Sequence, residues 1–312
     1  MQTPPPAPPA PSPANVRIGS RRLLSRFFWS LVVAVVLAYG SMGMWFVVNE
    51  TRMVYHPSRL VPPPESFSGF HHERVELQTK DHLRLVGWEM RTPAGDSSGA
   101  WLLYLHGNAG NISEWVDRYA QLQKLGVNVF TADYRGYGES EGRPEEQGLY
   151  LDAETMYDHL IEVLRVPPQR VIIYGHSLGS GVAVELAVRR KAACLIVEGA
   201  FTSVTDRGQE LYPYLPIRLF AQNHFDSIHK VGSLTIPKLF IHAVEDNVVP
   251  FSHGQKLYEA AAPPKTFLEL HGGHSSAIFH DEETFLNGVQ AFLINLHVVS
   301  SARRPILEPV SR

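Results

Sequence analysis

The stretch that decides the fold is VIIYGHSLGSGVAVELA, residues 171–187. It opens with four apolar residues, which is typical of a strand covered on both faces of a parallel sheet. A Gly-x-Ser-x-Gly motif centred on Ser177 follows, and an apolar helical run begins at Leu178. Strand, tight turn and helix are the context of a nucleophile elbow, where flanking glycines leave room for a strained serine. We therefore expect the Ser177 hydroxyl to project above the sheet at the start of a helix.

Apolar runs and helical stretches alternate on both sides of this motif. Six short apolar runs predict covered strands: residues 100–105, 127–132, 171–174, 193–197, 239–242 and 266–270. Five stretches read as helices: residues 113–124, 148–164, 178–190, 252–260 and 282–296. Residues 73–77 and 83–90 alternate around a turn and predict an antiparallel hairpin at one edge. The pattern predicts an α/β fold with a mostly parallel central sheet and helices on both faces, and functional groups beyond the carboxyl ends of the strands.

A base and an acid for Ser177 are expected after the last two strands. The chain has 15 histidines, but His274 lies in the loop just past the strand FLEL. Asp246 follows the strand KLFIH directly, so the order along the chain is serine, acid, histidine. A histidine can take the serine proton, and a carboxylate can orient that histidine. His271 and Glu245 are the neighbouring alternatives for the base and the acid.

Two backbone N–H groups are predicted to form an oxyanion hole. One is that of Leu178, at the start of the helix, and the other is that of Asn108, in the loop HGNAGN at 106–111. Glycines and a small residue in that loop let the backbone approach a substrate closely. The alternative for this loop is a plain turn capped by an asparagine.

Other polar residues near these motifs are expected to be structural. His106 and His176 stand beside motif residues and are interpreted as packing groups. Asp133 and Arg135 are expected to hold neighbouring loops by charged hydrogen bonds. The cluster at residues 71–73, His-His-Glu, lacks the spacing of a metal site on one helix face. We therefore expect no metal and no cofactor.

Together, the ordered motifs resemble an α/β-hydrolase-domain serine hydrolase. They are GHSLG, HGNAGN, DYRGYGES at 133–140, and the loops of Asp246 and His274. The resemblance covers roughly residues 70–297, and its membrane-anchored type has one N-terminal helix and a small lid. It implies a carboxylesterase, thioesterase, lysophospholipase or aminopeptidase chemistry. One departure is Ala243, where many relatives have a glycine after the strand.

An uncharged run at residues 27–48 predicts a membrane-spanning helix. At about 1.5 Å per residue its length is about 33 Å, enough for a hydrocarbon core of roughly 30 Å. A cleaved signal peptide, cut near residues 38–40, is the alternative, but the apolar run continues to Val48. Four arginines and no acid precede the run: Arg17, Arg21, Arg22 and Arg26. The positive-inside rule then predicts a cytoplasmic N-terminus and a domain on the extracytoplasmic side.

Five parts follow from these patterns. Residues 1–26 are predicted to be a disordered Pro-rich tail with the arginine cluster, and residues 27–48 the transmembrane helix. Residues 49–69 form a connecting segment, residues 70–297 the hydrolase domain, and residues 298–312 a C-terminal tail. Within the domain, residues 201–236 form a small lid. Its aromatic residues are expected to line an acyl pocket, touch the bilayer or pack on the domain.

The expected chemistry is cleavage of an acyl ester or thioester near a membrane. An aminopeptidase would instead need an acidic cluster in the lid, and the lid acids Asp206, Glu210 and Asp226 are scattered along the sequence. A catalytically silent binding module is the alternative outside the enzymes. The net charge of -3 gives no reason to expect nucleic acid, and the single Cys194 excludes an internal disulfide. The sequence leaves the oligomeric state open.

Overall fold

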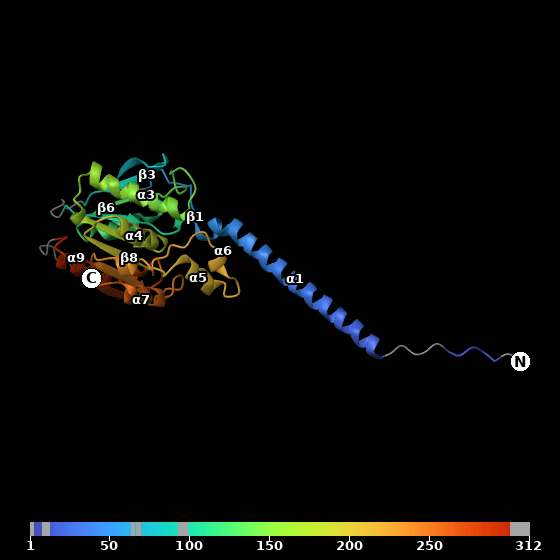
Figure 1. The fold of residues 1–312 in the computed structure, drawn as a ribbon. Helices are drawn as coiled ribbons and strands as arrows, with labels where there is room; N and C mark the ends of the chain where they lie inside the picture. The colour runs from blue at the N-terminus through green and yellow to red at the C-terminus, as the bar shows by residue number, and fades with distance from the viewer. Residues whose placement is uncertain (1–2, 8–12, 64–65, 67–69, 93–98, 300–312) are drawn as a thin grey trace, which may run out of the picture. The chain divides into compact units, whose positions relative to one another are not determined.

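The run around Ser177 folds as strand β7 (Val171–His176), a tight turn and helix α4 (Leu178–Arg189). This computed structural model describes residues 3–7, 13–63, 66, 70–92 and 99–299. The chain forms two compact units, Met1–Asn49 and Glu50–Arg312. The second unit contains the predicted sheet and its helices (Figure 1), and we call it the hydrolase unit because it holds the predicted hydrolase domain.

An eight-stranded sheet runs in the order β10-β9-β8-β7-β4-β6-β3-β2. Its strands are β2 (Glu73–Gln78), β3 (Arg84–Met90), β4 (Trp101–Leu105), β6 (Asn128–Ala132), β7, β8 (Cys194–Glu198), β9 (Lys238–Ala243) and β10 (Lys265–Leu270). Strands β2 and β3 pair antiparallel with Leu77 opposite Leu85, and β3 is also antiparallel to β6. All other pairs are parallel. The predicted hairpin at the edge is confirmed.

Helices cover both faces because alternate strand residues point to opposite sides. On one face, Leu103, Ile173 and Val197 pack with residues of α3 (Glu146–Asp158), α4 and α7 (Phe251–Ala260). On the other face, Tyr104 and Tyr174 pack with residues of α2 (Val116–Gln123) and α9 (Glu282–Asn295). The central strands are therefore apolar on both faces, and chemistry is confined to their ends.

Several helices differ from their predicted limits. The stretch predicted as one helix at 113–124 is a 3-10 turn, Ile112–Trp115, followed by α2. The stretch at 148–164 is α3 followed by a π-helical turn, His159–Val163. A short helix that was not predicted, α8 (Ala277–His280), precedes α9. Apart from α8, these differences concern helix ends, where backbone groups lack intrahelical partners and local geometry decides.

The segment predicted as a lid, residues 201–236, contains two short helices, α5 (Val204–Leu211) and α6 (Ile217–Phe220), and the 3-10 turn Val231–Ser233. We keep the name lid for this segment. In the later part of the lid, the Phe225 side chain is buried in the hydrophobic core of the unit. The Glu146 carboxylate accepts hydrogen bonds from the backbone N–H groups of His224, at 2.5 Å, and Phe225, at 3.0 Å.

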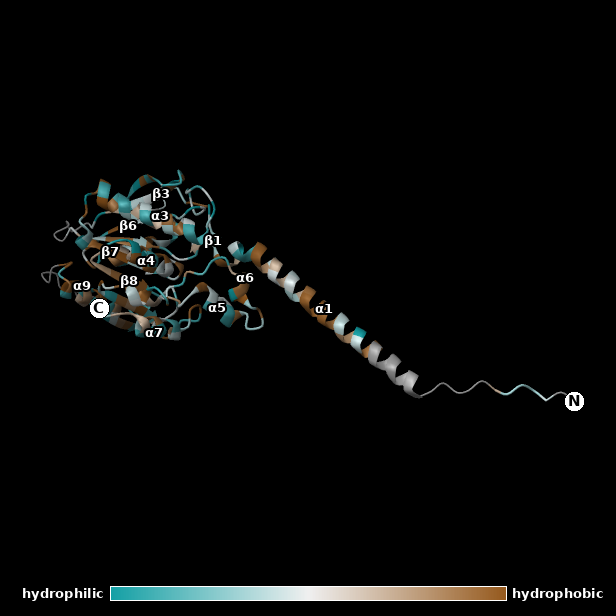
Figure 2. Cartoon of the chain, in the orientation of Figure 1, coloured by the Kyte–Doolittle hydropathy of each residue, from teal (hydrophilic) through white to brown (hydrophobic). Residues whose placement is uncertain are grey.

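Helix α1 (Pro13–Val54) contains the predicted membrane-spanning run. By length and composition its part Leu23–Val54 could cross a membrane, and Figure 2 shows its hydrophobic residues. The helix begins inside the segment predicted as a disordered tail, since proline is tolerated in the first turn of a helix. It also continues past residue 48, through residues that are compatible with helix.

The hydrolase unit begins at Glu50 rather than at residue 70. Strand β1 (His56–Pro57) pairs in parallel with β5 (Ala109–Gly110), and the Tyr55 side chain is buried. The described residues from Glu50 onward in the predicted connecting segment, 49–69, therefore belong to the hydrolase unit. At the other end Val298 and Val299 are buried, and the predicted tail from residue 300 lies outside the described residues.

Candidate active site

Ser177 occupies a strained position between β7 and α4. Its backbone has φ 53° and ψ -119°, a conformation that residues other than glycine rarely adopt. A side chain at Gly175 would strike the Gly179 carbonyl oxygen, and one at Gly179 would strike the Leu105 carbonyl oxygen. The two glycines therefore allow the tight turn, and the elbow predicted from the sequence is present.

The three residues proposed from their order along the chain meet in one hydrogen-bonded chain. His274 Nε2 lies 2.8 Å from Ser177 Oγ, and His274 Nδ1 lies 2.6 Å from Asp246 Oδ2. Because an ionised carboxylate only accepts hydrogen bonds, Nδ1–H donates to Asp246. Nε2 is then free to accept the Ser177 hydroxyl proton. This arrangement suits a histidine that acts as a base.

Asp246 is held in its ionised form. Burial alone would raise the pKa of this carboxyl, but hydrogen bonds from His242, His274 and the backbone N–H of Val249 outweigh it and hold the pKa well below its usual range. Asp246 Oδ1 accepts from the backbone N–H groups of Val248 at 2.9 Å and Val249 at 2.8 Å. A carboxylate fixed in this way can orient the His274 ring and stabilise its protonated form.

The two predicted oxyanion donors lie at the same edge of the sheet. Leu178 is the first residue of α4, so its N–H has no acceptor within the helix. Asn108 follows Gly107, and a Cβ atom built on Gly107 would lie 3.5 Å from the Ser177 Cβ. The Asn108 carbonyl accepts from His56 N at 2.8 Å, and its side chain donates to the Val54 carbonyl at 3.0 Å. These bonds fix the loop beside Ser177.

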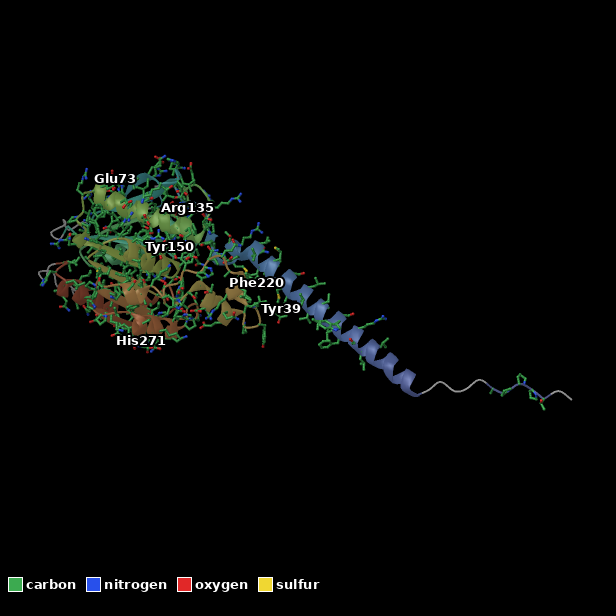
Figure 3. The ribbon with its side chains drawn as sticks, viewed as in Figure 1. Tyr39, Glu73, Arg135, Tyr150, Phe220 and His271 are labelled. Carbon is green, nitrogen blue, oxygen red and sulfur yellow. The ribbon has the colours of Figure 1, made fainter. Side chains whose placement is uncertain are left out.

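The alternative base and acid pair with each other instead. His271 Nδ1 lies 3.0 Å from Glu245 Oε1, and both side chains are more than half exposed. Figure 3 shows His271 at the surface of the hydrolase unit. The bond to Glu245 raises the pKa of His271. Neither residue makes a hydrogen bond to Ser177 or His274, so this pair is separate from the Ser177 chain.

The motif residues expected to be structural have structural partners. His106 Nδ1 lies 2.8 Å from the Gly107 carbonyl, and burial lowers the pKa of His106 to about 4. Asp133 accepts from the Ile112 N–H at 2.8 Å. Arg135 donates to Asp81 and Asp152, each at 2.8 Å. These contacts tie together the loops around the sheet edge.

A buried charged cluster behind His274 escaped the sequence analysis. Arg118 Nη1 donates to Glu198 Oε2 at 2.5 Å, and Tyr174 OH donates to the same oxygen at 2.6 Å. Arg118 Nη2 donates to the Ser275 carbonyl at 2.7 Å, next to His274. The Glu198 carbonyl accepts from Ser177 N at 2.9 Å. The cluster thus joins the serine turn and the histidine loop. The one signal in the sequence was an acid within the apolar run CLIVE.

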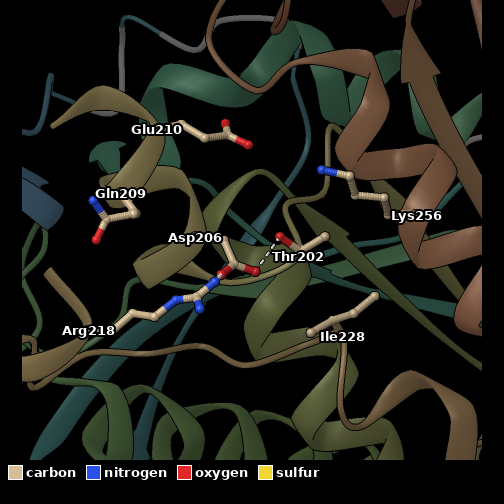
Figure 4. Close-up of a pocket in the computed structure, with 7 residues that line it drawn as sticks. All are labelled: Thr202, Asp206, Gln209, Glu210, Arg218, Ile228 and Lys256. Atoms are coloured by element: carbon tan, nitrogen blue, oxygen red, sulfur yellow. Dashed lines mark hydrogen bonds and ion pairs between the residues drawn. The ribbon is translucent and has the colours of Figure 1, made fainter. Parts of the chain in front are cut away.

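A hollow of about 400 Å³ lies beside the lid helices (Figure 4). Its lining includes Asp206, Glu210, Arg218 and Lys256. Two of the three lid acids, Asp206 and Glu210, are one helical turn apart in α5 and both line this hollow. Both already have basic partners: Arg218 lies 2.6 Å from Asp206, and His253 lies 2.9 Å from Glu210. Among the described residues, no group of three or more His, Cys, Asp or Glu side chains could hold a metal ion.

Comparison with known proteins shows which family the chain belongs to. The model of the alpha/beta hydrolase family matches residues 102–232. An uncharacterised protein of Mycobacterium tuberculosis, Rv2307c, is 36% identical over 271 residues, covering 86% of this chain and 96% of its own. The lysophosphatidylserine lipase ABHD12 of Danio rerio is 39% identical over 257 residues, which cover 70% of this chain and 66% of the lipase. The esterase Pf2001 of Pyrococcus furiosus shares the fold, with a TM-score of 0.63 at 21% identity, over 78% of this chain and 99% of its own.

The chain therefore belongs to the alpha/beta hydrolase family. Its fold and its relatives support a hydrolase.

Proposed function

We propose that this protein is a serine hydrolase that cleaves acyl esters or thioesters through an acyl-enzyme intermediate. The observation that carries the proposal is the position of His274, whose ring nitrogens lie 2.8 Å from Ser177 Oγ and 2.6 Å from Asp246 Oδ2. A serine hydroxyl becomes a strong nucleophile only when a base takes its proton. The order serine, acid, histidine also matches that of the α/β-hydrolase fold.

The first half of the reaction acylates the enzyme. Ser177 Oγ attacks the carbonyl carbon of the substrate while its proton passes to His274 Nε2. Asp246 stabilises the resulting imidazolium. As the tetrahedral intermediate collapses, the bond from carbon to the leaving oxygen or sulfur breaks. His274 returns its proton to the departing alcohol or thiol, and the acyl group stays on Ser177.

The second half releases the acyl group. A water molecule loses a proton to His274 and attacks the acyl carbon, the bond to Ser177 Oγ breaks, and His274 returns the proton to the serine. The products are a carboxylic acid and free enzyme. We propose the backbone N–H groups of Leu178 and Asn108 as donors to the oxyanion in both halves, where loss of one donor costs about 3–4 kcal/mol.

Substrates carried by a membrane fit this chain best. Residues 27–48 would anchor it, with the N-terminus in the cytoplasm and the catalytic unit on the extracytoplasmic side. One relative is named as a lipase for a lysophospholipid, which supports lipid esters as a substrate class. Protease added to intact cells should then cut the hydrolase unit, whereas complete protection would contradict the orientation.

An aminopeptidase is the second candidate, and the hollow beside the lid helices favours it most. Asp206 and Glu210 lie in one pocket there, where a substrate ammonium group could bind. Such an ammonium would have to compete with Arg218 and His253, which already pair with these acids. Esters and thioesters need no such site, so they remain the first choice.

A substrate panel separates these functions. The full chain in detergent micelles would be assayed with p-nitrophenyl esters of two to sixteen carbons, an acyl thioester and an aminoacyl p-nitroanilide. We expect ester or thioester turnover that falls at least about 10³-fold in Ser177→Ala, with Ser275→Ala as the matched control close to wild type. Amide cleavage alone would indicate the aminopeptidase, and no turnover of any substrate would favour a silent binding module.

A further inference from the structure

Large apolar side chains are exposed on the lid. Leu211 is 56% exposed, Tyr212 43%, Tyr214 86% and Leu219 80%. All four lie within nine residues, from the end of α5 to α6, and we call them the lid apolar surface. Single exposed apolar residues are ordinary on a soluble protein, whereas a group of them marks a binding surface.

The rest of the hydrolase unit has no comparable group among its described residues. There the exposed large apolar residues lie one to an element or loop, apart from Val244 and Val248, which share the loop after β9; the others are Leu60, Val163, Val188 and Phe279. The lid also has a different composition, with two tyrosines whose rings are apolar and whose hydroxyls can stay hydrated. Such amphipathic rings favour the boundary between lipid and water.

The attachment of the lid indicates what covers this surface. The Glu50 carboxylate accepts hydrogen bonds from the backbone N–H groups of Gln222 at 2.8 Å and Asn223 at 2.8 Å. Asn223 Oδ1 accepts a further bond from Tyr55 OH at 2.6 Å. Glu50 is buried, and through these bonds it holds the part of the lid that follows α6. The start of the hydrolase unit and the lid are thus held together.

Glu50 is also close to the proposed membrane span along the chain. It follows the last residue of the uncharged run, Val48, by two positions within the continuous helix α1, a rise of about 3 Å. Leu219 precedes Gln222 by three residues, a reach of at most about 11 Å. If residues 27–48 cross a bilayer, the covalent link through Glu50 keeps the clamped part of the lid within reach of the bilayer surface.

We propose that the lid apolar surface enters the interface of the bilayer that α1 crosses, so that an acyl ester reaches Ser177 from that leaflet. The inference rests on the proposed membrane anchorage and deepens the proposed function, because it assigns the lid a role in taking up lipid. The partner is the lipid surface itself. A second protein bound at the same place would give a different result in the experiment below.

A fluorescent probe placed on single cysteines tests the contact. The native Cys194 is fully buried, so a polarity-sensitive thiol-reactive dye should label only an introduced cysteine. Full-length Leu219→Cys and Tyr214→Cys would be reconstituted in phosphatidylcholine vesicles with and without nitroxide-labelled phosphatidylcholine. Val163→Cys is the matched control, since Val163 is apolar and 64% exposed but lies outside the lid.

We expect the dye at residues 214 and 219 to brighten several-fold in vesicles and to be quenched at least twofold by the nitroxide lipid, while the dye at 163 changes little. If the protein floats with the vesicles but no position is quenched, the anchor holds and the docking proposal is wrong. Quenching at all three positions would mean nonspecific adsorption and would overturn the docking proposal. Brightening without quenching by the nitroxide lipid would indicate a protein partner and would also overturn it. If the protein fails to float, the anchorage itself is wrong.

Kinetics separate the lid from the chemistry. In the double variant Tyr214→Ser, Leu219→Ser we expect the KM for an ester presented in vesicles to rise about tenfold. The kcat/KM for a short water-soluble ester should stay within twofold of wild type, as should both values in Val163→Ser. An equal loss on both substrates would show that these side chains support the fold of the lid and would overturn the proposal. The dye measurement needs no turnover, so it stands even if the proposed reaction is wrong.

Discussion

The buried ion pair behind His274 gives the sharpest test of stability. In Arg118→Met the Glu198 carboxylate loses its cation while it remains about 3% exposed. Removing one member of a buried pair costs about 3–5 kcal/mol, because the remaining charge is left without compensation. With a urea m-value of about 3 kcal/mol/M, the unfolding midpoint should fall by about 1–1.7 M. Trp115 packs 5.5 Å from the Arg118 guanidinium, so tryptophan fluorescence of the full chain in detergent can follow the transition.

The pH dependence of this loss has a definite sign. Burial raises the pKa of Glu198, but the charge of Arg118 and the hydrogen bonds of Arg118 and Tyr174 outweigh it, so the pKa lies below its usual value. The pair therefore stabilises the wild type above the pKa of the unfolded chain, and this stabilisation is lost as the pH falls through the folded pKa. Without Arg118, burial raises the pKa of Glu198 and the carboxyl can bind a proton when folded. The deficit of the variant should be largest near pH 8 and shrink toward pH 5.

Two further variants make the reasoning refutable. Arg118→Met combined with Glu198→Gln removes both charges and should recover at least half of the lost free energy of unfolding. Arg74→Met, which breaks the half-exposed pairs with Glu76 and Glu139, should cost at most about 1 kcal/mol. A deficit below about 1 kcal/mol in Arg118→Met, or a double variant no more stable than the single one, would contradict the role given to the pair.

Three more substitutions probe the site and the lid. Asp246→Asn should lower kcat about 10⁴-fold with normal folding by circular dichroism, because the amide no longer fixes the histidine tautomer, and near-normal kcat would exclude this acid. Gly179→Ala would push a Cβ into the Leu105 carbonyl oxygen and should leave little soluble protein, so a well-folded variant would contradict the packing of the elbow. Glu50→Gln weakens the charged clamp on the lid and should cost about 1–2 kcal/mol and speed proteolysis between residues 204 and 221, and an unchanged cleavage rate would argue against the clamp.

The parts of this fold that could be predicted are those that local pattern fixes. The continuous apolar run before Gly175 could only be a covered strand, and the glycines around Ser177 could only serve a tight turn. Since the carboxyl ends of parallel strands meet at one edge, Asp246 and His274 could be assigned from their places after successive strands. The order of these residues along the chain therefore predicted that they lie close together, and the hydrogen bonds between the three side chains agree with that prediction.

The parts that could not be predicted depend on contacts between distant residues. Arg118 and Glu198 are 80 residues apart, and nothing local distinguishes Arg118 from a solvated helix residue. Glu50 looked like an ordinary charge after an apolar run, yet it binds backbone 172 residues away. Asp206 and Glu210 are only four residues apart in α5, but the hollow that they line also needs Arg218 of α6 and Lys256 of α7, which the sequence did not connect with them. In each case the interaction depends on burial and on partners from other elements, which cannot be read from the local sequence.

The identity of the nucleophile is the central claim, and covalent labelling tests it most directly. A fluorophosphonate probe would be incubated with the full-length wild type, Ser177→Ala and Ser275→Ala, and the digested proteins analysed by mass spectrometry. We expect one adduct in the wild type and in Ser275→Ala, on the peptide that contains Ser177, and none in Ser177→Ala. An adduct on another serine, or equal labelling of the wild type and Ser177→Ala, would contradict the assignment of Ser177 as the nucleophile.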